Sequence, residues 1–285
     1  MRLAKTTRGT NRTMTRVRIP KRELLFDSKI KRLDDKWINY SDYLVLRDPN
    51  CGAAERWKTQ IYNIQHDASL ALVYAYSNQH LYHGHRVIRR NGEIVIHPQI
   101  IIKAFYLRYC TLLLQGCGDK LSQLVRTALG ITKLKKIKGK IVEDKATEKN
   151  ISLITIKTSL ELTLDGNSPE RERNILNEMK NYLEDNAVKT IIESANRIKH
   201  RWQLFFQGEG LQPINPEAKI IGENGRVIRN QLPACGYSKG ENIEEYIRLC
   251  LQTNNMFVDM ANAILEQLNF GQFYVVEGGR RLLKF

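Results

Sequence analysis

A regular pattern of apolar residues in residues 53–81 predicts an amphipathic helix. The apolar positions recur at steps of three and four residues: Trp57, Ile61, Ile64, Ala68, Ala71 and Leu72. This spacing places them on one face of a helix. Residues 98–115 are apolar almost all round, which is typical of a helix that is buried on every side. The Gln115-Gly116 pair that follows predicts the end of that helix, because glycine commonly terminates helices.

The pattern predicts further elements along the rest of the chain. These are a second helix within 119–140 that runs into a lysine-dense loop, a pair of strands over 151–164, and an amphipathic helix over 240–268. Residues 165–207 predict one long helix or two. Ser168 is expected to be the N-cap of this segment and Pro169 its first helical residue, because Ser favours the cap and Pro the first turn.

Two Asn-Gly pairs predict β-hairpins. Residues 86–97 hold alternating β-type runs on either side of Asn91-Gly92, and this is the strongest local signal for a hairpin. Residues 219–232 hold a second Asn-Gly element, which also contains the GxxG pattern of a KH domain. The hairpin is favoured, because the residues that follow, NQLPACGYSKG, are typical of turns rather than of a strand. The expected fold is mainly α with a few short β-hairpins.

The charge of the chain changes this picture of an ordinary helical protein. The 285 residues carry a net charge of +15, and a surplus of this size indicates a polyanionic partner, with nucleic acid favoured over an anionic membrane surface. No apolar run approaches the about 18 residues that a membrane span needs. Residues 1–22 hold eight Lys or Arg and no acid, which predicts a flexible basic arm. A mitochondrial targeting segment is the second interpretation, because the arm lacks an amphipathic face.

The candidate sites for metal binding and catalysis are weak. Five cysteines without a CxxC pair favour a reduced intracellular protein with buried thiols. His80, His83 and His85 lie together, but no Cys and few acids lie near them, so we expect no metal site and no cofactor. Arg90 and His97 are spaced as in some helical ribonucleases, yet the Asn-Gly turn and Pro98 break a helix between them. We therefore expect no catalytic residue, and a metal-independent nuclease is a lesser alternative.

Basic residues with aromatic neighbours predict an RNA-binding surface, because phosphates need cations along a groove and unpaired bases need aromatic faces. Each basic group alone is more often a solvated surface, but together they have no acidic block to match them. The aromatics nearby are Tyr76, Tyr82, Trp202, Phe205 and Phe206. The expected RNA-binding residues are Arg16, Arg18, Arg86, Arg89, Arg90, Lys133, Lys135, Lys136, Lys138, Arg197, Lys199, Arg201, Arg226 and Arg229.

Several short stretches, in order, resemble the nucleoprotein of orthomyxoviruses, the influenza-type viruses. They are DASLALVYAYSNQHLY with RVIRRNG, YCTLLLQG, ANRIKHRWQLFFQGEG and NQLPACGYSKG, and they cover about a quarter of the chain. The chain is much shorter than that family's members. The resemblance implies a two-lobed helical protein that coats single-stranded RNA without sequence preference, with Arg86, Arg89 and Arg90 at the groove. It also implies oligomers, for which the tail, residues 270–285, is our candidate contact.

These observations lead to one main hypothesis and one organisation of the chain. Residues 1–22 are the arm, 23–210 a helical body with the hairpin near 86–97, and 211–285 a C-terminal lobe and tail. The expected function is that of a non-enzymatic viral nucleoprotein, located in the virion and the infected cell. Its expected partners are single-stranded RNA and further copies of the chain, with a viral polymerase as a third candidate. No membrane partner is expected. The alternative is an organellar ribosomal or RNA-processing protein of the mitochondrial matrix, in which the arm is a targeting segment.

We predict that replacing Arg86, Arg89 and Arg90 together with Ala weakens binding to random single-stranded RNA. The reason is the loss of three permanently charged phosphate contacts. Fluorescence anisotropy measures the binding and circular dichroism the fold. Loss of the fold, rather than of binding alone, would assign these arginines a structural role.

Overall fold

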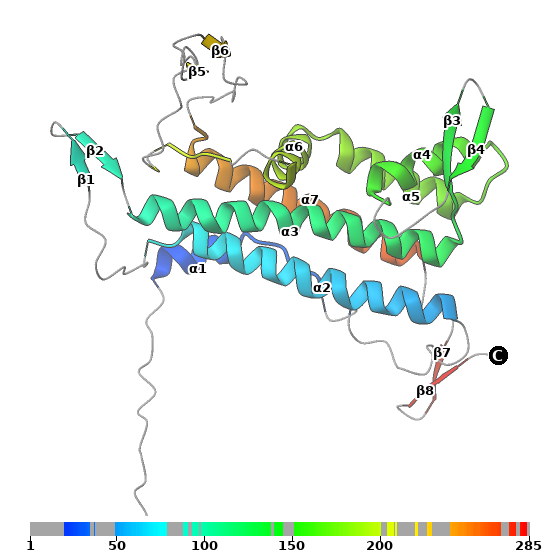
Figure 1. Cartoon of the computed structure of the whole chain (residues 1–285). Coiled ribbons are helices and arrows are strands. Elements are labelled where there is room, and N and C mark those ends of the chain that lie inside the picture. Colours follow the sequence, from blue (N-terminus) through cyan, green and yellow to red (C-terminus); the bar gives the residue numbers. More distant parts are fainter. Residues whose placement is uncertain are drawn as a thin grey trace, which may run out of the picture.

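The computed structural model shows a mainly helical protein (Figure 1). It describes residues 20–34, 37, 49–78, 88–90, 93–96, 98–137, 140–144, 151–200, 204–207, 209, 220–221, 227–229, 240–268, 274–277 and 280–283. The expected mainly α fold is confirmed. The arrangement in two lobes stays a prediction.

The helices and strands follow one another as seven helices and four antiparallel pairs of strands within the described residues. The helices are α1 (Lys21–Asp27), α2 (Pro49–Tyr76), α3 (Pro98–Leu129), α4 (Leu153–Thr163), α5 (Glu170–Glu184), α6 (Asn186–His200) and α7 (Ile243–Leu268). The strand pairs are β1 (Ile88–Arg90) with β2 (Glu93–Ile96), β3 (Lys133–Ile137) with β4 (Lys140–Asp144), β5 (Ile220–Ile221) with β6 (Val227–Arg229), and β7 (Tyr274–Glu277) with β8 (Arg280–Leu283).

Helix α3 is the centre of the bundle. It runs antiparallel beside α2 along nearly its whole length, while α4, α6 and α7 contact its other sides (Figure 1). The core consists of two clusters of buried side chains. One gathers α4 and α5 against the second half of α3, and the other gathers α1 and the segment around Leu204 and Phe206 against its first half. Because α2, α3, α6 and α7 contribute to both clusters, these four helices hold the bundle together.

Both Asn-Gly hairpins are confirmed. Strands β1 and β2 pair so that Arg90 lies opposite Glu93, on either side of Asn91-Gly92. Strands β5 and β6 pair with Ile220 opposite Arg229, which agrees with the hairpin rather than with the KH interpretation of this segment.

The expected helix end at Gly116 is wrong, because α3 continues to Leu129. Gly116 instead faces α2, where an added Cβ would lie 3.9 Å from the side chain of Ile64. The true end comes at Gly130, whose φ of +64° is left-handed. The amide of Ile131 donates to the carbonyl of Arg126 over 3.0 Å, which is the six-to-one bond of a Schellman cap. Residues 119–129 are therefore the last third of α3 and not a separate helix.

Two further expectations fail next to this end. The lysine-dense segment is a hairpin, β3/β4, and not a loop. Residues 151–164, expected as a strand pair, hold helix α4. The hydroxyl of Ser152 caps α4 by accepting a bond from the amide of Thr155 over 3.3 Å. Leu153, Ile156 and Leu160 are buried at helical spacing, so packing against the bundle overrides the β propensity of the isoleucines and threonines.

Residues 165–207 were expected to form one long helix or two, and the structure shows two, α5 and α6. Asp185 separates them, and its Oδ1 accepts bonds from the amides of Ala187 and Val188 at the start of α6. Ser168 is not the N-cap of α5. Its hydroxyl bonds to Asp165 within the preceding turn, and Pro169 stands at the cap without a side-chain bond.

Helix α3 meets the length and composition that a membrane-spanning helix needs, over Gln99–Leu129. The sequence analysis expected no stretch long and apolar enough to span a membrane. In the fold, however, α3 packs against α2, α4, α6 and α7. It is not buried on every side, as its apolar sequence predicted, because Ile101, Phe105 and Tyr109 are exposed. A central helix of a helical bundle needs the same apolar surface.

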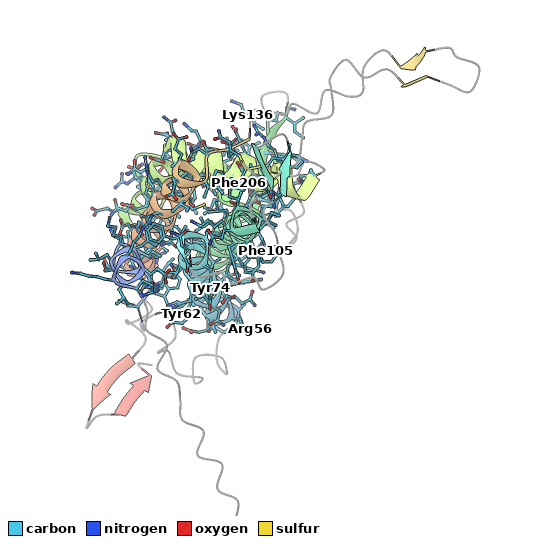
Figure 2. All side chains as sticks on the ribbon, turned by 90° about the vertical axis from the view of Figure 1, so that its left-hand side faces the viewer. Arg56, Tyr62, Tyr74, Phe105, Lys136 and Phe206 are labelled. Carbon is cyan, nitrogen blue, oxygen red and sulfur yellow. The ribbon has the colours of Figure 1, made fainter. Side chains whose placement is uncertain are left out.

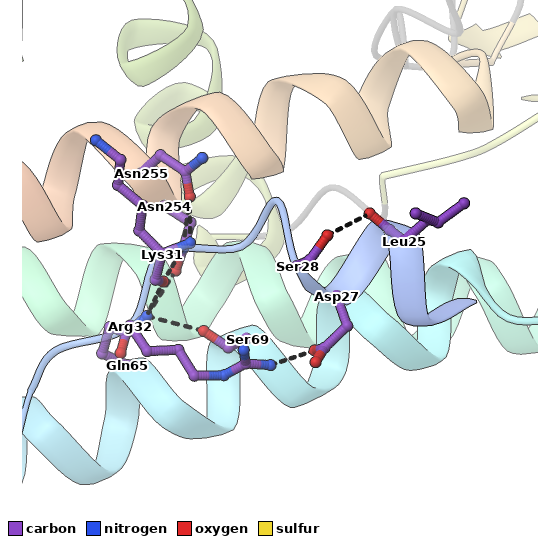
Figure 3. A network of polar contacts seen from close by, with 9 residues as sticks. All are labelled: Leu25, Asp27, Ser28, Lys31, Arg32, Gln65, Ser69, Asn254 and Asn255. Carbon is purple, nitrogen blue, oxygen red and sulfur yellow. Dashed lines mark hydrogen bonds and ion pairs between the residues drawn. The ribbon is translucent and has the colours of Figure 1, made fainter. Parts of the chain in front are cut away.

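A buried polar network joins the chain after α1 to α2 and α7 (Figure 3). Gln65 on α2 is fully buried. Its Oε1 accepts from the amide of Leu33 over 3.1 Å, and its Nε2 donates to the carbonyl of Lys31 and to Asn254 on α7 over 3.1 and 3.0 Å. Asn254 donates to the same carbonyl over 2.9 Å. Amide side chains from α2 and α7 thus satisfy backbone groups of the extended segment after α1.

Replacing Gln65 with Leu is expected to lower the free energy of unfolding by about 2 to 4 kcal/mol. The volume changes little, but the amide of Leu33 and the side chain of Asn254 lose partners inside the core. Urea unfolding followed by circular dichroism measures this loss. The control is Asn63→Ala on the exposed side of α2, which we expect to change stability by no more than about 0.5 kcal/mol. Equal effects of the two changes would show that the network contributes little.

Helix α2 also buries a lysine. The side chain of Lys58 is 0% exposed, and its Nζ lies 3.5 Å from Oε1 of Glu55. Burial lowers the pKa of Lys58 to about 8, against the smaller opposing effect of Glu55. Between about pH 8 and pH 10.5 the neutral amine is therefore favoured in the folded chain and the charged amine in the unfolded chain.

This difference predicts that stability rises with pH. Between about pH 8 and pH 10.5 the unfolded chain binds more protons at this site than the folded chain, so unfolding becomes less favourable as pH increases. The contribution over the whole window is about 3 kcal/mol. Urea unfolding of the natural chain and of Lys58→Met at pH 7, 8.5 and 10 isolates it, because other lysines titrate in both proteins. Parallel pH profiles of the two proteins would contradict the lowered pKa.

Candidate nucleic-acid interface

The β3/β4 hairpin gathers lysines at the end of the bundle where α3 stops (Figure 1). The register pairs Lys133 with Asp144, Lys135 with Val142 and Ile137 with Lys140. Residues directly opposite each other in an antiparallel pair share a face, so these six side chains lie together. The amide of Leu134 donates to the hydroxyl of Ser159 on α4 over 3.0 Å, which ties the hairpin to the bundle.

Only part of the hairpin's positive charge is neutralised within it. The carboxylate of Asp144 lies 3.0 Å from Nζ of Lys133 and 3.3 Å from Nζ of Lys135. Hydrogen bonds from these two lysines lower the pKa of Asp144. Lys136 and Lys140 are exposed, and neither has an ion pair with the described carboxylates. They remain available to an external anion.

A basic cleft of about 550 Å³ opens where the first turns of α2 meet the last turns of α3. Arg56, Lys120 and Arg126 line it together with Trp57 and Gln60. Its wall continues through Gly130, Ile131 and Thr132, which lead directly into β3. The cleft and the hairpin are therefore neighbours, and together we call them the basic end.

Two cations of the cleft are held in place by an aromatic ring and by an amide side chain. The ammonium of Lys120 lies 4.6 Å from the centre of the Trp57 ring, a cation–π contact. Nε of Arg126 donates to Oε1 of Gln123 over 3.1 Å. Among the described residues no Asp or Glu lines the cleft, and neither Arg56 nor Arg126 has an ion pair with any of them. Three cations so close repel one another, and an anion in the cleft would relieve that repulsion.

The structure brings together some of the predicted RNA-binding residues and separates others. Lys133, Lys135 and Lys136 share the hairpin. Arg197 and Lys199 are exposed in the last turn of α6, where Lys199 lies 3.8 Å from Asp119. Arg89 and Arg90 stand on β1 and Arg229 on β6. Arg16, Arg18, Arg86, Lys138, Arg201 and Arg226 lie outside the described residues, as do His80, His83, His85 and His97.

The sequence analysis missed the cleft itself. Arg56 has only the buried Lys58 as a basic neighbour in its helix turn, and nearly two turns of α3 separate Lys120 from Arg126. None of them belongs to a basic run. They meet because α2 and α3 are antiparallel, which places the start of one helix beside the end of the other. The signal would have been the pairing of the two helices, which single-helix periodicity does not contain.

The described residues hold no group of three or more His, Cys, Asp or Glu that could bind a metal. Cys110, Cys117 and Cys250 are free and buried, which confirms for these three the expected role as core residues. The hydrogen bond between Cys110 and Cys250, together with burial, raises the pKa of Cys110, and burial raises the pKa of Cys117. Both are therefore thiols rather than reactive thiolates.

Comparisons of the chain with models of protein families, with curated proteins and with solved structures find no match. The resemblance to orthomyxovirus nucleoproteins therefore depends on the short stretches quoted above alone.

Proposed function

We propose that this chain is a non-enzymatic protein that binds single-stranded RNA without sequence preference. The observation that supports the proposal is the basic end, in which a lysine hairpin adjoins a cleft of three cations whose described lining residues include no acid. Arginine and lysine side chains at such a place bind phosphate, which every RNA carries. Contacts to phosphate alone cannot distinguish sequences.

The shape of the basic end supports a chain-like ligand over a small one. The cleft is open and lies at the foot of a hairpin whose outer residues Lys136 and Lys140 are exposed. A polyanion can place one phosphate in the cleft and others along the hairpin, whereas a single small anion would use only one of the two. The counterions released along the strand then make the affinity depend on salt.

The finer part of the proposal is a viral nucleoprotein that coats an RNA genome and forms oligomers. Its support is the resemblance of the stretches quoted above and the charge of +15. The tail, residues 270–285, is proposed as the contact between protomers, with the polymerase of the virus as a further partner. Strands β7 and β8 pair with each other in one chain, so this contact would use them as a hairpin.

The proposal predicts a steep and localised dependence on salt. The logarithm of the RNA affinity should fall linearly with the logarithm of the salt concentration, with a slope of about −0.7 for each phosphate contact. In Arg56→Ala with Arg126→Ala, and in Lys136→Ala with Lys140→Ala, the slope should become shallower by about 1.4. Fluorescence anisotropy with labelled random RNA at several salt concentrations measures both.

The matched control is Lys29→Ala with Arg248→Ala, two exposed cations outside the basic end. It removes the same net charge and should leave the slope nearly unchanged. An RNA affinity that does not depend on salt would refute the proposal. Equal losses in the control and in the basic-end variants would refute the location.

Three observations separate the alternatives. Degradation of the RNA that is lost in His97→Ala would favour a nuclease. A mature protein whose N-terminus is cut near Arg22 would favour the organellar RNA-binding protein. Rings or strings of protomers with RNA in negative-stain micrographs would favour the nucleoprotein.

A further inference from the structure

A cluster of aromatic side chains lies on the α2/α3 pair at the end opposite to the basic end. Phe105 is 61% exposed, Tyr109 44% and Tyr74 43%. Tyr106 connects Tyr74 with Phe105, because its ring stacks on Tyr74 with centroids 5.0 Å apart and meets Phe105 edge-on at 5.4 Å. Tyr109 follows Phe105 at helical spacing on the same face of α3. Large exposed rings are unusual on a surface that only faces water, and a contiguous group of them indicates a binding surface.

The aromatic cluster and the cleft lie on the same side of the helix pair. On α2, residues at steps of three and four connect the two: Arg56, Gln60, Asn63, Asp67, Leu70 and Tyr74. On α3 the corresponding row is Phe105, Tyr109, Leu112, Gly116 and Lys120. Residues at this spacing share one helix face. In the end-on view of Figure 2, Arg56 and Phe105 accordingly lie on one side of the pair, and Tyr62 lies on the other side of α2.

The length of this face suits a short strand of nucleic acid. Twenty-one residues of α3 separate Phe105 from Arg126, which is about 30 Å at the rise of an α-helix. Stacked nucleotides advance by about 3.4 Å, so the face spans about nine of them, and fewer if the strand is extended. Between the two ends, Gly116 has no side chain that would obstruct a strand, and Asp67 is the exposed acid on the α2 row.

We infer that this face is a track for single-stranded nucleic acid, in which bases stack on Phe105 and Tyr109 while phosphates bind Arg56, Lys120 and Arg126. The inference rests on the proposed function and adds to it a second kind of contact. Aromatic rings and bases stack without regard to sequence, because every base has a flat face. The cations at the far end of the face favour a polyanion over a hydrophobic partner protein.

The track selects for strandedness. A duplex presents its phosphates to the cleft as a single strand does, but its base faces are covered by neighbouring pairs and cannot reach Phe105. The protein should therefore bind a single strand more tightly than a duplex of the same sequence. Removal of the aromatic rings should abolish this difference while phosphate binding persists.

The experiment compares three probes on the full chain: an oligoadenylate of about twelve nucleotides, which exceeds the track, its duplex with oligouridylate, and inorganic polyphosphate. We expect Phe105→Leu with Tyr109→Leu to bind the single strand at least about tenfold more weakly, as the loss of stacking predicts. Its affinity for polyphosphate should not change. Phe105→Trp with Tyr109→Phe, which keeps the rings, should bind as the natural chain does. The control Leu25→Ala with Ile154→Ala removes exposed apolar residues elsewhere and should have no effect.

The outcomes distinguish this inference from the proposed function. If the leucine variant binds the single strand normally while Arg56→Ala with Arg126→Ala does not, the stacking track is refuted and RNA binding stands. If the natural chain binds none of the three probes, both are refuted. If the leucine variant changes self-association in sedimentation but not RNA affinity, the aromatic cluster is a protein contact and the inference is overturned.

Discussion

The close approach of α2 and α3 is the constraint on which the other features of this structure depend. Ala68, Ala71 and Ala75 on α2 and Ala104 on α3 are buried almost completely, and Gly116 faces Ile64 across the same interface. Small side chains let two long helices lie near each other over many turns. The pairing brings Arg56 to Lys120 and Arg126 at one end and Tyr74 to Tyr106 at the other. Neither grouping exists on an isolated helix.

Buried polar contacts fix the position of the segments that the pairing of α2 and α3 does not hold. Gln65 and Asn254 hold the extended residues after α1 against α2 and α7. On α3, Nε of Arg108 donates to the carbonyl of Leu204 over 2.7 Å, and Glu209 accepts both from this guanidinium and from the amide of Phe206. Apolar contacts tolerate small shifts, whereas a buried donor without its acceptor destabilises the fold strongly. These bonds therefore select one position for each segment that has no regular structure of its own.

Local sequence patterns predicted the elements whose own residues specify them. The amphipathic helices α2 and α7 and the hairpins at the two Asn-Gly pairs were of this kind. The failures at Gly116 and at residues 151–164 have a tertiary cause. Gly116 remains helical because α2 packs against it, and α4 is helical because Leu153, Ile156 and Leu160 must reach the core. Propensity is decided within a few residues, whereas these contacts join residues that are distant in the chain.

The same argument explains why half of the candidate site was visible in the sequence and half was not. Lys133, Lys135 and Lys136 stand in one run, so their concentration is a property of the sequence. Arg56, Lys120 and Arg126 become a site only when two helices meet. Repulsion among these three cations destabilises the folded chain. Among the described residues, only the contacts of Lys120 with Trp57 and of Arg126 with Gln123 offset it. A bound polyanion would remove this repulsion, so the fold and its ligand should stabilise each other. A surface that is less stable empty than occupied is what a binding protein needs, and it is not what a purely structural surface would retain.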